Sequence, residues 1–388
     1  MPRTQPGLTR NAVHLLPEGE LERKLELGRP LRVKLGIDVT SPDIHVGRGI
    51  PLQRMRAFQD AGHTGVLIIG DYTTRIGDPS GRSIERPILS DAEIDRNART
   101  YIEQAYQIID PARTEVRFNG EWLGKLTFAE VVRLTRTSTV ARLLERDDFA
   151  KRYSAGEPIS VSELLYPLMQ AYDSVAVEAD LELGGTDQLY NLLAGREVMQ
   201  AYGLAPQVVL TTPLLVSWDG AKMSSSLGNN IPLTAPPEEQ FGRAMRIPDE
   251  LLEEWWRLVA EQPVPPDEPM EAKLALARWI VARSHGSAAA AAAEEHFTRV
   301  VRRQEAPEDV PEETFAATSD LVHLPPLLRR WFGLGSTSEA RRIVEQGGLR
   351  IDGVVVRKLD VAADDLDGAL VQAGKRRFAR VFRADGHP

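Results

Sequence analysis

A strand–helix–strand pattern near the start of the chain constrains its fold more than any other feature of the sequence. Residues 31–38 (LRVKLGID) alternate between apolar and polar positions and end at a turn, which is typical of a strand. Residues 49–61 place apolar side chains at helical spacing, and residues 65–70 (GVLIIG) form the short apolar run of a strand buried on both faces. Two strands joined through a helix in this way make a βαβ unit, which predicts a parallel sheet.

The same alternation continues to about residue 210, with helical patterns around 127–145 and 186–202. We therefore predict a doubly wound, Rossmann-like α/β catalytic domain over residues 1–220, with an inserted helical region.

The remainder of the chain divides at an acidic, proline-bearing stretch, residues 304–313 (QEAPEDVPEE), which is typical of a linker. Residues 221–320 are therefore predicted to hold a mobile loop, a helical domain and this linker. In residues 321–388 a short helical pattern leads to a glycine pair, a strand pattern and the Asp352-Gly353 hairpin signal. This sequence predicts a small α+β domain of its own.

Composition narrows the class of protein. The 388 residues are 42% apolar and 27% charged, which are ordinary values for a globular protein. The chain has no cysteine, which excludes disulfides and cysteine-ligated metal centres and fits a cytoplasmic protein. No apolar run approaches the ~20 residues of a membrane-spanning helix, so no membrane partner is expected.

Charge is distributed unevenly along the chain. Residues 321–388 carry 12 Lys or Arg against 8 Asp or Glu, whereas residues 1–320 carry 35 against 48. A basic end on an acidic body suggests a nucleic-acid contact confined to that end, although random variation of surface charge is the alternative. The candidate RNA contacts in this tail are Arg341, Arg342, Arg350, Arg357, Lys358, Lys375, Arg376 and Arg377.

Two polar segments far apart in the sequence suit a phosphate site. At residues 36–48 (GIDVTSPDIHVGR) a strand ends and a helix begins, and the free N–H groups of a helix start attract phosphate. His45 could donate to a phosphate oxygen and Gly47 could admit a flat base, although a histidine satisfied within the turn is the alternative. Residues 219–230 (DGAKMSSSLGNN) place one lysine before three hydroxyl groups, a set of donors that suits a polyphosphate.

A polar stripe on an apolar helix suits a small polar ligand. Tyr166, Gln170 and Asp173 fall at i, i+4 and i+7 after the capping-box pattern of Ser160 and Glu163, so they share one helical face. A phenol, an amide and a carboxylate in one line can recognise several groups of one ligand. A solvated helix face is the alternative.

Two more segments carry charged or close-packing residues next to predicted strands. Asp78 and Arg82, in GDPSGR, offer a carboxylate for an ammonium and a guanidinium for phosphate, and Arg86 follows. Gly185 and Asp187, in LGGTDQ, follow another predicted strand and permit close approach of a ligand to the backbone. Ordinary turn chemistry and helix capping would explain these two segments as well.

Together these segments resemble the class I aminoacyl-tRNA synthetases. His45-Val-Gly-Arg48 looks like their HIGH signature, and Lys222-Met-Ser-Ser-Ser226, 177 residues later, looks like their KMSKS loop. GDPSGR, YPLMQAYD and GGTDQ are similar to the tyrosyl-tRNA synthetases in particular. The tail from about Leu324 resembles the small RNA-binding domain that the bacterial enzymes share with a ribosomal small-subunit protein. The resemblance covers nearly the whole chain.

The resemblance implies that tyrosine and ATP form tyrosyl-adenylate and pyrophosphate, and that the tyrosyl group then passes to the 3′ end of tRNA(Tyr). This chemistry needs positioning and charge stabilisation but no covalent nucleophile. The implied catalytic residues are Thr40, His45, Arg82, Arg86 and Lys222, with Mg²⁺ accompanying ATP and no tightly bound metal. The implied ATP-binding residues are Gly36, Asp38, His45, Gly47, Arg48, Gly185, Asp187, Lys222, Met223, Ser224, Ser225 and Ser226.

The resemblance also implies a tyrosine pocket made of Lys34, Asp78, Tyr166, Gln170, Asp173 and Gln188. In it Asp78, Tyr166 and Gln170 would hold the substrate ammonium, and Asp173 would accept a hydrogen bond from the phenol. A homodimer is expected because relatives form one, and no DNA partner is expected.

Three residues depart from the family pattern. Ser225 stands where the common signature has a second lysine, which leaves one positive charge fewer at the leaving group. Arg48 replaces the final histidine of the first signature. Lys34 stands where one bacterial branch has a tyrosine that touches the phenol, so the second partner of the phenol is unknown.

Two other functions fit parts of the sequence. A tryptophanyl-tRNA synthetase has a similar body, but an indole offers no hydroxyl for Asp173, and that enzyme usually lacks the tail. A non-catalytic relative that only binds RNA would not need His45, Asp78 and Lys222 together. Tyrosine-dependent exchange of pyrophosphate into ATP, with tryptophan as the control, separates the three hypotheses.

Overall fold

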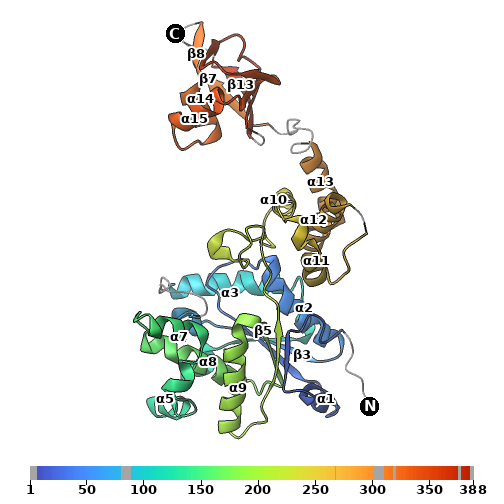
Figure 1. Cartoon of the computed structure of the whole chain (residues 1–388), viewed down its shortest axis with the longest axis vertical. Coiled ribbons are helices and arrows are strands. Elements are labelled where there is room, and N and C mark those ends of the chain that lie inside the picture. Colours follow the sequence, from blue (N-terminus) through green and yellow to red (C-terminus); the bar gives the residue numbers. More distant parts are fainter. Residues whose placement is uncertain are drawn as a thin grey trace. The chain divides into compact units, whose positions relative to one another are not determined.

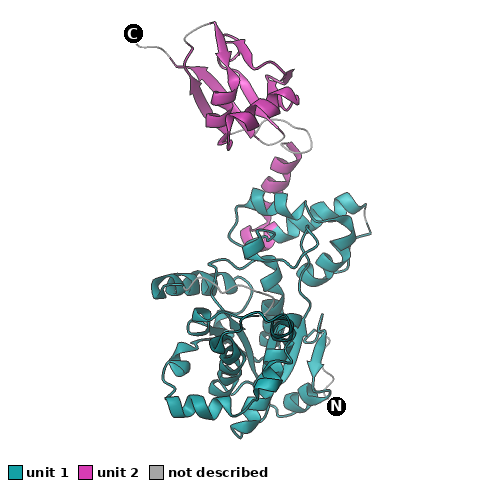
Figure 2. Cartoon of the chain, turned by 60° about the vertical axis from the view of Figure 1, so that its left-hand side comes forward, with its two compact units in different colours: residues 1–280 teal, residues 281–388 magenta. Residues whose placement is uncertain are grey.

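The computed structural model describes residues 7–79, 89–266, 268–299, 310–317, 320–374 and 377–384 (Figure 1). The chain forms two compact units, residues 1–280 and residues 281–388 (Figure 2). The domain boundaries expected near residues 220 and 320 stay predictions. In the part of the chain that the structure describes, no helix combines the length and the apolar character needed to cross a bilayer.

The first unit is built on a six-stranded sheet in the order β1-β6-β5-β2-β3-β4. Strands β2 to β6 pair in parallel, and only β1 runs antiparallel, against β6. This arrangement confirms the predicted Rossmann-like α/β fold. The strands are β1 (His14–Leu16), β2 (Arg32–Ile37), β3 (Thr64–Ile69), β4 (Thr114–Phe118), β5 (Leu181–Gly185) and β6 (Val208–Thr212).

The predicted βαβ unit is β2, α2 (Val46–Asp60) and β3. All four residues from Val66 to Ile69 are fully buried, as expected of a strand covered on both faces. On α2, Leu52, Met55 and Phe58 are fully buried, so the helical spacing of apolar residues marks the face that packs on the sheet.

The order of the strands fixes where a ligand can bind. In the strand order, the connection from β2 through α2 to β3 leads toward the β4 edge of the sheet. The connection from β5 through α9 (Leu189–Ala201) to β6 leads toward the β1 edge. The two crossovers diverge between the neighbouring strands β2 and β5. Ligands of such sheets bind outside the carboxyl ends of the strands at this switch point.

Helices α8 (Val161–Ala176) and α9 pack against each other beside the sheet (Figure 1). The predicted capping box opens α8: the side chains of Ser160 and Glu163 each accept from the other residue's backbone N–H. The helix predicted over 127–145 is instead two helices, α5 (Phe128–Thr135) and α6 (Val140–Leu143), because the Thr139 side chain caps a new helix start. The pattern at 186–202 is confirmed as a short 3₁₀ turn followed by α9.

The remaining elements before residue 300 connect the strands of the first unit or follow β6, and the residues after 280 among them belong to the second unit. The other helices are α1 (Glu20–Leu25), α3 (Asp91–Ala105), α4 (Gly120–Leu123), α7 (Asp147–Ser154), α10 (Pro237–Ala244), α11 (Leu252–Trp255), α12 (Pro269–His285) and α13 (Ser287–Phe297). Short 3₁₀ turns occur at Thr73–Arg75, Pro111–Arg113, Thr186–Gln188, Ser225–Leu227 and Asp249–Leu251, and a π-helical turn at Trp256–Ala260.

The second unit contains a small α+β module, as the sequence predicts. Its five-stranded sheet has the order β10-β9-β12-β13-β7, and β8 pairs with β11. Asp352 and Gly353 both have positive φ and close the predicted hairpin between β9 and β10. The elements are β7 (Glu312–Phe315), β8 (Leu321–His323), α14 (Leu324–Phe332), α15 (Thr337–Glu345), β9 (Leu349–Ile351), β10 (Val354–Val356), β11 (Asp360–Ala362), β12 (Leu370–Ala373) and β13 (Arg377–Arg383).

Candidate active site

The two distant signature segments lie side by side. Val46 donates its backbone N–H to the Ile231 carbonyl at 3.0 Å, and Leu233 donates to the Ile44 carbonyl at 2.8 Å. These bonds flank an antiparallel bridge between His45 and Pro232. The entry to α2 is thereby joined to the segment that directly follows the serine-rich loop.

His45 caps the start of α2 as a neutral imidazole. Its Nδ1 accepts the Arg48 backbone N–H at 3.3 Å, and only 6% of the residue is exposed. Burial, followed by the positive charges of Arg48 and Lys222, lowers the pKa of His45 to about 3. Because Nδ1 is the acceptor, the ring proton lies on Nε2, which is then a hydrogen-bond donor without a charge.

Lys222 brings a positive charge to the same place. Its Nζ lies 2.5 Å from Oδ2 of Asp187, which follows the carboxyl end of β5. Slightly more than half of the lysine side chain is exposed, so water screens this ion pair, and we expect it to contribute about 0–1 kcal/mol to stability. A weak pair of this kind can exchange for a stronger anionic partner of the lysine.

The serines after Lys222 are held by two asparagines of the same loop. Asn229 Oδ1 accepts the Ser224 backbone N–H at 2.8 Å, and Asn230 Nδ2 donates to Ser225 Oγ at 3.3 Å. The hydroxyl groups of Ser224 and Ser226 lie 2.9 Å apart. Met223 is buried, and its backbone N–H donates to the Leu215 carbonyl at 2.9 Å, which anchors the start of the loop.

Two glycines leave room next to these groups. Gly36 lies in the central strand β2, yet a Cβ added there would meet no atom within 4 Å. The middle of the sheet is therefore open above Gly36, at the end where the switch point lies. A Cβ at Gly47 would come within 3.3 Å of the His45 ring, so glycine there lets α2 start close to the histidine.

Tyr166 reaches from α8 to the end of β2. Its hydroxyl donates to Asp38 Oδ2 at 3.0 Å, and Thr73 donates to the other oxygen, Oδ1, at 2.8 Å. Burial and the adjacent Asp38 carboxylate raise the pKa of Tyr166 well above its usual value of 10.0, which keeps the phenol protonated as a donor.

Asp173 lies about two turns further along α8 and is almost fully buried. Trp122 Nε1 donates to its Oδ1 at 2.8 Å, and Asn119 Nδ2 donates to its Oδ2 at 3.3 Å. Burial raises the pKa of Asp173 to about 7, while the charge of Lys34 and these two donors oppose that rise. Asp173 is a buried carboxylate with acceptor capacity left over, as a hydroxyl ligand requires.

Asp78 belongs to a second hydrogen-bonded group in the same region. Gln188 Nε2 donates to its Oδ2 at 2.7 Å, and Arg146 Nη2 donates to its Oδ1 at 3.0 Å. Asn191 Nδ2 bridges the side-chain oxygens of Gln170 and Gln188, at 3.1 Å each. The structure thus brings Asp78, Gln170 and Gln188 together, as a shared ligand site requires.

Lys34 is placed differently from the expectation that it lines the ligand pocket. It is fully buried, and Nζ lies within 2.9 Å of Gln170 O, Ser174 Oγ and Glu182 Oε1. An ammonium has three N–H donors, and these three partners use them all. The structure therefore argues against a direct contact between Lys34 and a ligand.

The remaining expected site residues are placed as follows. Thr40 lies in the turn between β2 and α2, and the Arg48 guanidinium interacts with the buried phenol of Tyr101. Arg82, Arg86, Lys375 and Arg376 lie outside the described residues. In the tail, Arg350 is half-buried, and the side chains of Arg341, Arg342, Arg357, Lys358 and Arg377 are exposed.

Sequence reasoning missed the partners of the predicted groups: Asn119, Trp122, Arg146, Glu182 and Asn191. Arg146 gave no signal, because it belongs to no motif and meets Asp78 only through the fold. Glu182 did give one, since a lone acid within the apolar strand β5 demands a buried partner. Lys34 on β2 shows the same signal.

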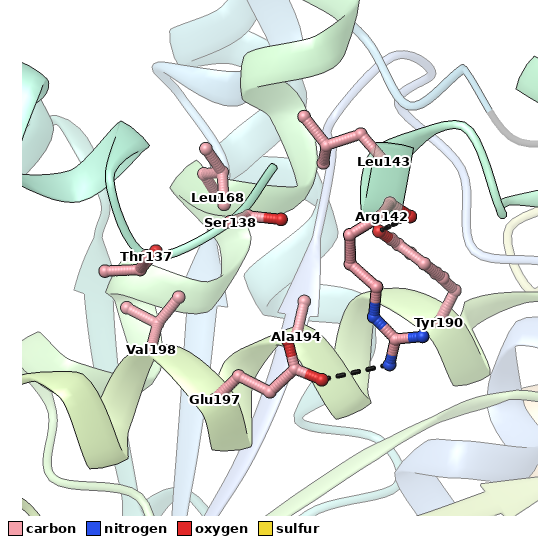
Figure 3. A pocket seen from close by; sticks show the side chains of 9 residues that line it. All are labelled: Thr137, Ser138, Arg142, Leu143, Leu168, Tyr190, Ala194, Glu197 and Val198. Carbon is pink, nitrogen blue, oxygen red and sulfur yellow. Dashed lines mark hydrogen bonds and ion pairs between the residues drawn. The ribbon is translucent and has the colours of Figure 1, made fainter. Parts of the chain in front are cut away.

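A separate small cavity opens between α8, α9 and the segment that joins α5 to α6 (Figure 3). The Arg142 guanidinium donates to Glu197 Oε1 there at 3.0 Å. None of the expected ligand contacts lies among its lining residues, so this cavity is distinct from the site at the switch point. It is lined by Thr137, Ser138, Arg142, Leu143, Leu168, Tyr190, Ala194, Glu197 and Val198.

Comparison with known proteins agrees with this geometry. Residues 26–302 match the family described as tRNA synthetases class I (W and Y). The tyrosine–tRNA ligase of Thermotoga maritima is 47% identical, with 96% of each chain covered, and that of Moorella thermoacetica is 48% identical, with 96% of this chain and 94% of that protein covered. The solved structure of Archaeoglobus fulgidus tyrosyl-tRNA synthetase, complexed with L-tyrosine, superimposes with a TM-score of 0.62 at 25% identity, covering 74% of this chain and 98% of that one. This chain brings its two signatures together beside the switch point of the sheet. It belongs to the tyrosyl-tRNA synthetases of class I.

Proposed function

We propose that the chain is a tyrosine–tRNA ligase whose active site is the region between His45, Lys222 and the polar face of α8. It activates L-tyrosine with ATP and transfers the tyrosyl group to tRNA. The observation that supports this site best is the pair of backbone hydrogen bonds between residues 44–46 and 231–233, which we call the clasp. The clasp holds both signatures at the carboxyl ends of β2 and β5. One triphosphate can then meet both signatures.

The proposed activation step uses the site residues as donors. The tyrosine carboxylate attacks the α-phosphorus of ATP, and pyrophosphate leaves. His45 Nε2–H donates to a phosphate oxygen without adding charge, and Lys222 leaves Asp187 to neutralise the departing phosphates. Thr40, Arg82 and Arg86 assist at the same phosphates, and Gly36, Gly47 and Arg48 face the nucleoside.

The proposed tyrosine pocket lies along α8. Asp173 accepts the hydrogen bond of the substrate phenol, because Trp122 and Asn119 fix its carboxylate. Asp78, Tyr166 and Gln170 hold the substrate ammonium. The Arg146–Asp78 ion pair implies that the guanidinium shares this carboxylate with the ligand.

Mg²⁺ is proposed to enter with ATP. Among the described residues, no group of three or more His, Asp or Glu side chains could hold a metal ion, so we assign no protein ligand and no step to it. The phosphates of ATP themselves supply the oxygen ligands that Mg²⁺ prefers.

The tail is proposed to bind tRNA through the exposed basic side chains of α15 and of the segment after β10. Its core is made of residues between 315 and 381, so the module has a hydrophobic centre of its own. We also infer a cytoplasmic location from the proposed substrates, since charged tRNA is used where proteins are made.

A homodimer is proposed to form through helices α5 to α8, with a second copy of this chain as the partner. Five large apolar side chains are exposed along these helices, including Phe128 at 84% and Val161 at 73%. Burial of such side chains against a second copy would remove their apolar surface from water. The five residues are Phe128, Val132, Val140, Tyr153 and Val161.

The decisive experiment is exchange of labelled pyrophosphate into ATP by the full chain. We expect exchange that depends on tyrosine, with tryptophan and phenylalanine as controls, followed by tyrosyl transfer when tRNA(Tyr) is added. Exchange driven by tryptophan, or no exchange with any amino acid, would overturn the proposal.

A further inference from the structure

We propose that Lys34 and Glu182 form a buried pair that positions Gln170, acts through its charges on Asp173, and thereby sets the preference of the pocket for a hydroxylated ring. The inference rests on the proposed function, because it concerns the selectivity of that same pocket. Lys34 on β2 and Glu182 on β5 lie directly opposite each other in the parallel register. Their charged atoms are 2.9 Å apart, and the two side chains are 0% and 1% exposed.

The pair is closed to the ligand by its own hydrogen bonds. Lys34 donates to Gln170 O at 2.9 Å, to Ser174 Oγ at 2.7 Å and to Glu182. Glu182 also accepts from Gln170 Nε2 at 3.2 Å, from Ser174 Oγ at 3.3 Å and from Gln207 Nε2. A buried ion pair is stable only when its remaining donors and acceptors are satisfied, and this pair meets that condition. Lys34 and Glu182 are therefore positioning residues.

The first group that they position is the amide of Gln170. Its Nε2 is held by Glu182, and its Oε1 is held by Asn191 at 3.1 Å. These two bonds fix the nitrogen of the amide toward Glu182 and its oxygen toward Asn191. The remaining lone pair of Oε1 therefore has a set direction. Without Glu182 the amide can turn over and present a donor where the substrate ammonium needs an acceptor.

The second group that the pair affects is the carboxylate of Asp173, through charge and not through a contact. Burial raises the pKa of Asp173 to about 7, and the positive charge of Lys34 opposes the rise more than the negative charge of Glu182 adds to it. Lys34 therefore helps to keep Asp173 an acceptor near neutral pH. The titratable groups that face Asp173 are Lys34, Glu182 and Tyr166, and its neutral donors are Trp122 and Asn119. The titratable groups that face Tyr166 are Asp38, Asp78 and Asp173.

The test is the double variant Lys34→Met, Glu182→Gln, which removes both charges at similar size and leaves no buried charge unpaired. The matched control is Arg32→Met, Glu115→Gln, because Arg32 on β2 pairs with Glu115 on β4 at 2.7 Å, at a partly exposed position. Pyrophosphate exchange is measured with tyrosine and with phenylalanine between pH 6 and pH 9.

We expect the Lys34, Glu182 variant to lower the tyrosine-over-phenylalanine ratio of kcat/KM about tenfold or more, with the KM for ATP within about twofold of wild type. The tyrosine profile should move to higher pH and recover above about pH 8, since Asp173 now ionises later. The control variant should keep both the ratio and the profile.

An unchanged ratio together with an unchanged profile, or the same change in the control variant, would overturn the inference. If the double variant does not fold, Ser174→Ala removes the hydroxyl that bridges the pair and should lower the ratio in the same direction. An unchanged ratio in that variant would overturn the inference as well. If the wild-type chain shows no tyrosine-dependent exchange of pyrophosphate, that result refutes the proposed function itself.

Discussion

Val46 and Ile231 are joined by a 3.0 Å backbone hydrogen bond, although most of the first unit's sequence separates them. A backbone bond of this kind places two loops without depending on the side chains that later touch a ligand. Substitutions at His45 or Lys222 can therefore change the chemistry and leave the clasp in place.

Replacing His45 by asparagine should slow pyrophosphate exchange about 10²–10³-fold, the usual effect of losing one donor to a developing charge. The KM for tyrosine should stay near wild type, because among the described residues no hydrogen bond joins His45 to Asp173 or Gln170. His63→Asn is the control: His63 is another histidine of this unit and accepts the Leu31 backbone N–H at 3.2 Å. A large rise in the tyrosine KM of the His45 variant would contradict the assignment.

Replacing Lys222 by methionine should raise the KM for ATP and lower kcat by about 10²-fold or more, because one positive charge on the leaving phosphates is lost. The free energy of unfolding should change by less than about 1 kcal/mol, because the Lys222–Asp187 pair is exposed. Arg56→Met, which breaks the exposed pair of Arg56 with Asp60, is the control. Activity lost only in proportion to stability would count against a role at the phosphates.

The stability of the unliganded protein should depend on the titration of Asp173. The folded state holds this proton up to about pH 7, whereas the unfolded chain releases it near the ordinary value of 3.8. In that window the folded state binds more protons, so the contribution of Asp173 falls as pH rises from about 4 to about 7. The measured quantity is the free energy of unfolding of wild type minus that of Asp173→Asn. It should drop by about 1–4 kcal/mol between pH 4 and pH 8, and a flat difference would show that Asp173 titrates normally.

The titration of Asp173 should also appear in the pH dependence of the KM for tyrosine. The KM for tyrosine should fall as pH rises from 6 to 8, because ionised Asp173 is the better acceptor for a phenol. The KM for ATP should not follow this profile, since the pKa of His45, about 3, keeps that ring neutral throughout the range. Parallel changes in both constants would point to a general loss of structure.

Exchanging the exposed charges of Arg341 and Arg342 for glutamate should weaken tRNA binding and aminoacylation while exchange of pyrophosphate continues at the wild-type rate. The two arginines lie on α15, whereas His45 and Lys222 belong to the first unit. Binding of wild type to tRNA should weaken with added salt, and the variant should show a shallower dependence. Removal of residues 321–388 should give the same division, and equal loss of both steps would contradict it.

The chain with Phe128→Ser and Val161→Ser should remain folded but associate less, because both side chains are exposed and contribute little to the interior. Sedimentation at several concentrations measures the association. Leu227→Ser, at a residue that is 63% exposed in the loop after Lys222, is the control for a surface substitution elsewhere. Wild type that stays monomeric at every concentration would contradict the proposed interface.

The parts of the fold that follow from local pattern could be predicted from the sequence. The run at 65–70 is a strand because only apolar residues suit both buried faces, and the Asp352-Gly353 pair closes its hairpin because the turn needs positive φ. The break between α5 and α6 was missed, because the apolar spacing runs through it and only the cap at Thr139 marks a new start. The antiparallel edge strand β1 was missed too, since three residues carry too little pattern.

The candidate site likewise contains residues that the sequence pattern places and residues that only the fold brings together. Tyr166, Gln170 and Asp173 could be placed on one face from their spacing alone. Arg146 could not, because its meeting with Asp78 depends on how α7 folds back, which no local pattern records. The direct role first expected of Lys34 fails for a similar reason: that expectation needs knowledge of Glu182, which becomes its neighbour only once β5 lies next to β2.

The clasp also limits how the serine-rich loop can move. Met223 bonds to Leu215 at one end, through its backbone N–H at 2.9 Å, and Ile231 bonds to Val46 at the other, so residues 224–230 form an arm tethered at both ends. The reach of such an arm is bounded by its contour length, at most ~3.5 Å per residue. Lengthening it would widen the volume that the hydroxyl groups of Ser224, Ser225 and Ser226 can sample and dilute these donors around the leaving group. The short arm thus keeps a high local concentration of hydroxyl donors next to the fixed backbone of Lys222, which is bridged to Val216.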